Sequence, residues 1–260
     1  MGLILEVGYL ADMLENDEEG AQWFGEDMSK LNAFLVSQNL QPHHEPRVCQ
    51  IFSCEMYGYS GLHYLRRFAA HLDLRAVKPP PGKPYAEMVD EEEHDPVLLE
   101  YFEQADEDYA AAPDQRQLRP RRFDHLILHS DSGGFYIPQD LPHVLIAPDE
   151  LDLHEMIGSS QRLLAECVEL ASALELPLDI DLESDIVWDA ANAQGEGDST
   201  AATAGDTPNA ATSTATAAIS TSTAGTRPAW QRYGIESFIC LRLHHAAQHS
   251  IKTGAAIVFC

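Results

Sequence analysis

Two histidines and an aspartate near the middle of the chain have side chains that bind transition metals. His125, His129 and Asp131 are separated by four and two positions, so in an extended strand all three would point to the same face. Imidazole and carboxylate groups are ligands of zinc, iron and manganese. In a strand, His125 and His129 would lie about 13 Å apart, too far for one shared ion, whereas His129 and Asp131 would lie about 7 Å apart. The alternative is that these side chains form hydrogen bonds beside a turn.

A second group of polar side chains lies near the C-terminus. If residues 235–249 form a helix, Arg242, His245 and His249 fall on or beside its apolar face. An unpaired buried guanidinium is very costly. In one interpretation, Arg242 therefore pairs with a carboxylate such as Asp131, and the histidines pack nearby.

The second interpretation is a metal site. His245 and His249 are one helical turn apart, a spacing at which two imidazoles can share an ion, and they could join His129 and Asp131. His244 points away from this face. No Glu follows His245, which excludes the helix motif of zinc proteases.

The elements that would hold these side chains follow from the hydrophobic pattern. The segment 124–138 predicts two strands joined by a tight turn at Gly133 and Gly134. Further strands are expected over 3–7 and 255–260, and helices over 17–35, 60–72 and 235–249. Another helix is expected to start at Ser159 or Ser160, with Leu174 as its last inward apolar residue and Pro177 ending it. Strands and helices interleave without strict alternation. This predicts an α+β fold, with an open α/β fold as the second choice.

One long segment lacks the residues of a folded core. From Asp189 to Pro228 the chain is mainly Ala, Thr, Ser, Gly and Asn, with Ile219 as the one large apolar residue. Such a segment buries too little surface to offset its ordering entropy. An apolar strand pattern resumes at the C-terminus. We therefore predict a single globular domain formed by 1–188 and 229–260, interrupted by a disordered low-complexity insertion over 189–228.

The chain is strongly acidic. Its 260 residues include 42 acidic and 16 basic side chains, with a net charge of −26. Proteins that bind nucleic acid neutralise phosphates with Lys and Arg, so we expect no nucleic acid partner. Between Lys83 and Asp114, twelve carboxylates face one lysine. This block is either a solvated loop carrying a short helix over 96–108, or a surface for a basic protein partner.

The sequence shows no features of an exported or membrane protein. The N-terminal residues lack a basic region before their short apolar run. No apolar stretch approaches the roughly 18 to 20 residues needed to cross a bilayer. The five cysteines are odd in number and scattered, which is typical of reduced, mostly buried thiols. We expect a cytoplasmic protein without membrane contact.

Five segments of the chain carry a resemblance to a family: 1–12, 62–67, 129–138, 158–160 and 256–260. Together they are similar to a family of uncharacterised, acidic, intracellular bacterial proteins, and the resemblance spans nearly the whole chain outside 189–228. It implies a shared fold and supplies no catalytic residue. The likeness of such proteins to immunity or antitoxin proteins is an analogy.

The charge, together with the lack of a coherent catalytic motif, favours a non-catalytic interaction protein. In this hypothesis its carboxylates bind a basic protein partner, as an immunity protein or inhibitor would. No cofactor is expected. Arg242, Asp131 and Tyr136 are the candidates for contact with a partner or ligand.

Two alternatives stay open. One is a metal-dependent hydrolase with His129, Asp131, His245 and His249 as ligands. The other is a domain that binds a small anionic ligand, with Arg242 as the anion clamp.

Overall fold

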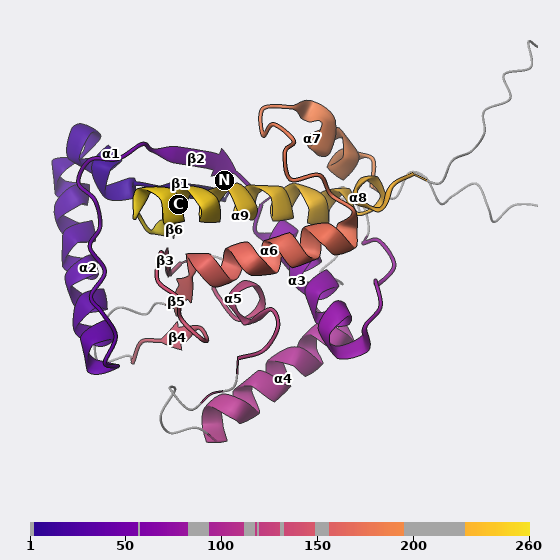
Figure 1. Ribbon diagram of the computed structural model, residues 1–260, viewed down its shortest axis with the longest axis horizontal. Helices are drawn as coiled ribbons and strands as arrows, with labels where there is room; N and C mark the ends of the chain where they lie inside the picture. Colours follow the sequence, from indigo (N-terminus) through magenta and orange to yellow (C-terminus); the bar gives the residue numbers. More distant parts are fainter. Residues whose placement is uncertain are drawn as a thin grey trace, which may run out of the picture.

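The computed structural model describes residues 3–56, 58–82, 94–111, 118, 120–130, 133–148, 156–194 and 227–260. These residues form one mixed sheet with helices on both faces (Figure 1). The predicted α+β class is confirmed.

Six strands of the described chain follow the order β2-β1-β6-β3-β5-β4. Their bounds are β1 Ile4–Val7, β2 Phe52–Glu55, β3 Phe135–Ile137, β4 Leu145–Ile146, β5 Met156–Ser159 and β6 Ile257–Phe259. Neighbouring strands are antiparallel, except that β3 and β5 run parallel. Because β6 lies between β1 and β3, the first and last strands of the chain complete the same sheet.

The helix α9 is central on its face of the sheet and packs against α3, α6, α7 and α8. The bounds of the helices are α1 Tyr9–Asn16, α2 Glu18–Ser37, α3 Gly58–Arg75, α4 Pro96–Ala111, α5 Asp124–Ile127, α6 Ser160–Leu174, α7 Asp185–Asn192, α8 Ala229–Arg232 and α9 Gly234–Thr253. Apolar and small residues occupy most sides of α9, which is why it can be buried by several neighbours at once.

Consecutive residues of the central strand β3 face two separate apolar clusters. Tyr136 belongs to the cluster that contains α3, α6 and α9, whereas Phe135 and Ile137 belong to the cluster that contains α2. A strand that is covered on both faces needs apolar side chains at every position. The sheet is therefore the middle layer, with α9 and α6 on one face and α2 on the other.

Two of the predicted helix starts are confirmed by their caps. The Asp17 side chain accepts a hydrogen bond from the backbone N–H of Gly20 at 3.0 Å, at the start of α2. The Ser159 hydroxyl accepts from the backbone N–H of Arg162 at 3.2 Å, at the start of α6. The helix expected over 96–108 is also present, as α4.

The strand predicted for the first part of 124–138 is wrong. Residues 124–127 form the single helical turn α5, and the strand β3 begins only at Phe135. His125 and His129 therefore do not share the face of a strand, and Gly133 and Gly134 do not join a hairpin.

Two buried side chains from distant helices hold α5 at its ends. The Glu166 carboxylate of α6 accepts from the backbone N–H groups of His125 and Leu126 at 3.0 and 2.8 Å. The Arg66 guanidinium of α3 donates to the carbonyl oxygens of Leu126 and His129 at 3.0 and 2.6 Å. A single turn is unstable alone because its backbone groups are unsatisfied. Here tertiary contacts satisfy them.

The folded chain extends past the boundary predicted at Asp189. The helix α7 ends at Asn192, and Ala190 and Ala191 are buried. The start of α9 packs closely on this turn, since a Cβ atom on Gly234 would lie 2.1 Å from the carbonyl oxygen of Ala190. The rest of the predicted insertion, residues 195–226, lies outside the described residues.

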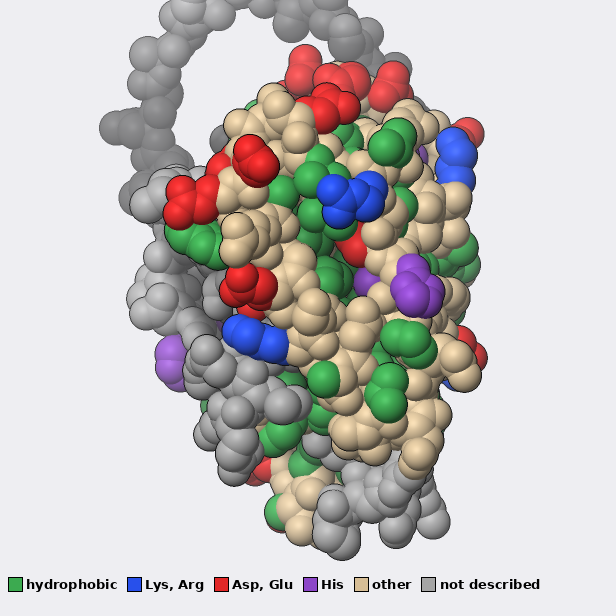
Figure 2. All heavy atoms as spheres, turned by 90° about the vertical axis from the view of Figure 1, so that its left-hand side faces the viewer, with side chains coloured by type: hydrophobic (Ala, Val, Ile, Leu, Met, Phe, Trp, Pro, Cys, Tyr) green, Lys and Arg blue, Asp and Glu red, His purple; other side chains and the backbone are tan. Residues whose placement is uncertain are grey.

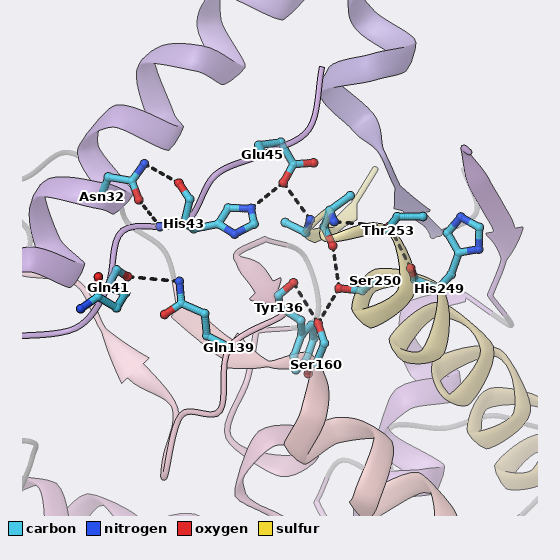
Figure 3. A network of polar contacts seen from close by, with 12 residues as sticks. Asn32, Gln41, His43, Glu45, Tyr136, Gln139, Ser160, His249, Ser250 and Thr253 are labelled. Carbon is cyan, nitrogen blue, oxygen red and sulfur yellow. Dashed lines mark hydrogen bonds and ion pairs between the residues drawn. The ribbon is translucent and has the colours of Figure 1, made fainter. Parts of the chain in front are cut away.

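A polar network attaches the loop after α2 to the end of α9 and the start of β6 (Figure 3). Asn32 exchanges hydrogen bonds with the backbone of His43 at 2.8 and 2.6 Å. The buried Glu45 carboxylate accepts from the His43 ring at 2.6 Å and from the backbone N–H of Ala256 at 2.8 Å. These bonds fix the position of α2 relative to the sheet.

Candidate functional site

His129, a candidate metal ligand, lies in the core against Tyr136. The two rings stack with their centroids 3.9 Å apart and 17° between their planes, and both side chains are buried. The His129 ring nitrogens lie 3.0 and 3.2 Å from the carbonyl oxygens of Ser130 and Phe135. Burial lowers the pKa of His129 to about 4, so the ring is neutral near pH 7. Both ring nitrogens face backbone oxygens.

Tyr136 and His125 are also interior residues. The Tyr136 hydroxyl donates to the carbonyl oxygen of His125 at 2.7 Å. His125 accepts the backbone N–H of Ser159 at Nδ1, at 3.0 Å, and its Nε2 donates to the carbonyl oxygen of Leu141 at 3.1 Å. These partners fix the neutral tautomer with the proton on Nε2. Burial lowers the pKa of His125 to about 3, and its role here is to join α5 to β5.

Two glycines make room for the stacked rings. A Cβ atom on Gly158 would lie 2.4 Å from Cδ1 of Tyr136, and one on Gly134 would lie 2.9 Å from Cε1 of His129. Gly134 also has a φ of +88°, a conformation that other residues rarely adopt. The glycine that suggested a hairpin turn in the sequence therefore serves the packing of His129.

Arg242 and His249 attach α9 to β2 and the residues before it. The Nε of Arg242 donates to the carbonyl oxygen of Glu55 at 2.7 Å, and Nε2 of His249 donates to that of Gln50 at 2.7 Å. The His249 ring also stacks on Phe52, with the centroids 5.4 Å apart. Arg242 thus has a backbone partner. Asp131, the carboxylate suggested for it, lies outside the described residues.

The burial of His244 and His245 on α9 differs from the burial that the helical pattern predicts. His244, expected to point away from the apolar face, is only 4% exposed, whereas His245 is half-buried and in hydrogen-bond contact with the backbone of Leu178. The reason is that α9 is covered on several sides. Burial lowers the pKa of both rings.

The histidines proposed as metal ligands therefore have other partners. His129 faces the backbone of Ser130 and Phe135, His245 that of Leu178, and His249 that of Gln50. Within the described ranges, no group of three or more His, Cys, Asp or Glu side chains is placed to hold a metal ion.

The described part of the acidic block centres on α4. Two of its carboxylates are neutralised by arginines from neighbouring elements: Glu100 pairs with Arg75, and Asp108 pairs with Arg121 at 2.5 Å. Three further carboxylates on α4 are exposed, those of Glu103, Asp106 and Glu107. The charge of α4 is therefore partly compensated.

A second concentration of carboxylates, which we call the acidic segment, lies over residues 175–189. Its carboxylates are all exposed: Glu175, Asp179, Asp181, Glu183, Asp185 and Asp189. Leu178, Ile180 and Leu182 alternate with them and pack on the main core, so the acids point outward. Among the described residues, the ion pairs of this segment include only Lys78 with Glu175, at 3.9 Å. The sequence analysis did not single out this surface, although the alternation of acidic and apolar residues is a signal that could have indicated it.

A third concentration lies where α1 meets α2, and we call it the α1–α2 corner. It consists of Asp12, Glu15, Asp17, Glu18 and Glu19, which are exposed or half-buried. Figure 2 shows acidic side chains gathered at the top of the face that α1 and α2 form. No Lys or Arg occurs in the sequence before Lys30, so the corner has no basic residue close along the chain.

The fold and these surfaces define an acidic α+β protein whose exposed carboxylates gather on particular elements. The chain belongs to the family described as "Putative DNA-mimic protein", which it matches over residues 1–259. No curated protein and no solved structure matches the chain. The predicted membership of a single family across nearly the whole chain is confirmed. Nothing supports the analogy with immunity proteins.

The family corrects the partner expectation, which set nucleic acid aside, because its description connects the chain with DNA through mimicry. The net charge of −26 argues against binding to DNA phosphates. It does not argue against imitating DNA, because a mimic needs the same sign of charge as the phosphates themselves. The described residues also contain no helix of the length and apolarity that a membrane span requires.

Proposed function

We propose that this chain is a non-catalytic acidic protein that occupies the DNA-binding surface of a basic protein in place of DNA. The observation that carries the proposal is the acidic segment: six exposed carboxylates within fifteen residues, without an intervening Lys or Arg. We expect the chain to act in the cytoplasm, where it can meet such a partner.

The chemistry of recognition is common to carboxylates and phosphates. Arg binds either group through two parallel hydrogen bonds, and Lys binds either as a point charge. A DNA-binding surface that neutralises phosphates can therefore also receive rows of carboxylates. In this proposal, release of counterions from both surfaces contributes to affinity, as it does for DNA.

Charge also favours rapid encounter with such a partner. The net charge of −26 attracts a basic protein over about one Debye length, roughly 8 Å at physiological salt. We expect fast association that slows steeply as salt is added.

The proposal is tested by affinity capture with two elutions. The chain is immobilised and incubated with lysate of the cells that express it, and the column is washed first with a 30-bp duplex and then with salt. We expect duplex DNA to elute DNA-binding proteins. Bound proteins that duplex DNA does not displace, or that lack a DNA-binding surface, would contradict the proposal.

A further inference from the structure

Two of the acidic surfaces lie on one edge of the molecule. In Figure 1, α1, β2 and α7 follow one another along the upper edge, with the α1–α2 corner at one end and the acidic segment at the other. The exposed Glu55 of β2 lies between them. We call this surface, from the corner through Glu55 to the acidic segment, the acidic edge. The helix α4 lies elsewhere, near the bottom of the same view.

Arg242 links the middle of the edge to the acidic segment. Its guanidinium interacts electrostatically with both Glu183 and Glu55, so these two carboxylates lie near the same charge. Arg242 is itself half-buried, with its guanidinium over the Phe238 ring and its Nε bonded to the backbone. Glu55 and Glu183 are exposed, so the two carboxylates are more accessible than the guanidinium between them.

The helix at each end of the edge also carries an exposed tryptophan. Trp23 of α2 is 62% exposed and lies one helical turn from both Glu19 and Glu26. Trp188 of α7 is 44% exposed and lies one turn after Asp185. Tryptophan is among the residues that most often dominate the energy of protein interfaces. A large aromatic surface set among carboxylates fits a partner whose basic side chains have apolar stems or aromatic neighbours.

We infer that the acidic edge is the surface that enters the partner's DNA-binding groove, and that Trp23 and Trp188 anchor its two ends. This inference rests on the proposed function. The partner is a protein with an extended basic groove, because only such a groove contacts carboxylates along the whole edge while leaving α4 outside. The α1–α2 corner can act together with α7 because the Asn32, His43 and Glu45 network holds α2 on the sheet.

The inference is tested by site-specific photocrosslinking with p-benzoylphenylalanine. The full chain is produced in the cells that naturally express it, with p-benzoylphenylalanine incorporated at position 23, 188 or 99. Leu99 of α4 is 42% exposed and is the matched control. We expect positions 23 and 188 to form adducts with the same protein, at least tenfold above position 99. Adding a 30-bp duplex to the lysate before irradiation should abolish those adducts.

The outcomes separate this inference from the proposed function. Adducts could form from position 99 rather than from positions 23 and 188 and still be abolished by duplex DNA. That result would contradict the assignment of the acidic edge as the binding surface, but not the proposal of DNA mimicry. Absence of adducts at all three positions, with DNA-displaceable capture intact, would also overturn the edge. Failure of capture itself would overturn the proposed function.

A second measurement uses the captured partner in purified form. Trp23→Ala and Trp188→Ala should each weaken its binding at least tenfold, and Leu99→Ala should change it less than twofold. Equal effects of the three substitutions would contradict the inference. Circular dichroism of each variant checks that the fold is retained.

Discussion

The guanidinium carbon of Arg242 lies 3.4 Å from the centre of the Phe238 ring, one helical turn earlier on α9. Trp188 of α7 packs on the same ring, with the centroids 5.3 Å apart. The Phe238 ring therefore supports both the arginine that holds β2 and one of the exposed tryptophans. This contact connects the interior of the molecule to the acidic edge.

Replacing Arg242 should destabilise the fold. Arg242→Ala removes the hydrogen bond to the carbonyl oxygen of Glu55 and the cation–π contact with Phe238. We expect a loss of about 1–3 kcal/mol in the free energy of unfolding, measured in urea. Arg242→Lys keeps the charge but not the planar group, so its loss should be smaller. An unchanged urea midpoint for Arg242→Ala would contradict this assignment.

Two glycine substitutions should have opposite effects. Gly158→Ala places a methyl group 2.4 Å from Cδ1 of Tyr136, so we expect a loss of about 1–3 kcal/mol. Gly25 lies inside α2 and an added Cβ would meet nothing within 4 Å, so Gly25→Ala should stabilise the fold by up to about 1 kcal/mol. Thermal or urea unfolding measures both. Tolerance of alanine at Gly158 would show that Tyr136 is not packed as described.

The buried histidines should make the fold sensitive to acid. The pKa of His125 falls to about 3 and that of His129 to about 4 in the folded chain, below the unfolded value of about 6.5. Between these values the unfolded chain binds protons that the folded chain does not. The free energy of unfolding should therefore fall as the pH falls from about 6.5 towards 4.

The contribution of one ring can be isolated by substitution. His125→Asn keeps an acceptor for the backbone N–H of Ser159, and it should reduce the slope of unfolding free energy against pH by about 1.4 kcal/mol per pH unit in this range. His44 is exposed, so His44→Asn is the control and should leave the slope unchanged. Equal slopes for the unsubstituted chain, His125→Asn and His44→Asn would contradict the assignment of this acid sensitivity to His125.

Carboxylates of the acidic segment should repel one another. The combined substitution Asp179→Asn and Asp189→Asn removes two exposed charges and keeps Glu183, which interacts with Arg242. We expect a gain of a few tenths of a kcal/mol at low salt that disappears in 1 M salt. Glu169→Gln, which breaks the pair with Arg122, should give no gain.

Much of the fold could be predicted from the sequence because its helices carry their own signals. The cap at Asp17, the cap at Ser159 and the apolar spacing of α2 and α6 are local features that the structure preserves. The alternation of Leu3, Leu5 and Val7 likewise places β1 correctly. Such elements are specified by residues near one another in the chain.

The segment around His125 was mispredicted because distant residues determine it. Its apolar pattern fits a strand, but Glu166 and Arg66 satisfy the ends of a helical turn there. Neither contact is visible in the local sequence. The buried position of His129 follows from the same turn and from Gly134, so its assignment as a metal ligand rested on the wrong element.

The candidate surface could be predicted only in part. Composition revealed the acidic block between Lys83 and Asp114, but arginines remote in sequence, including Arg75 and Arg121, compensate part of α4. The acidic edge depends on the fold, because α1 and α7 lie far apart in the sequence and are brought to the two ends of the same upper edge in Figure 1.

Competition with DNA for the captured partner tests the central claim most directly. A fluorescein-labelled 30-bp duplex bound to the purified partner is titrated with the chain, and fluorescence anisotropy and sedimentation are recorded at several salt concentrations. DNA mimicry predicts that the chain displaces the duplex from the partner completely and that no complex contains all three components. It also predicts that the apparent affinity of the chain for the partner falls in proportion to the concentration of free duplex. A stable ternary complex of chain, partner and duplex would contradict it.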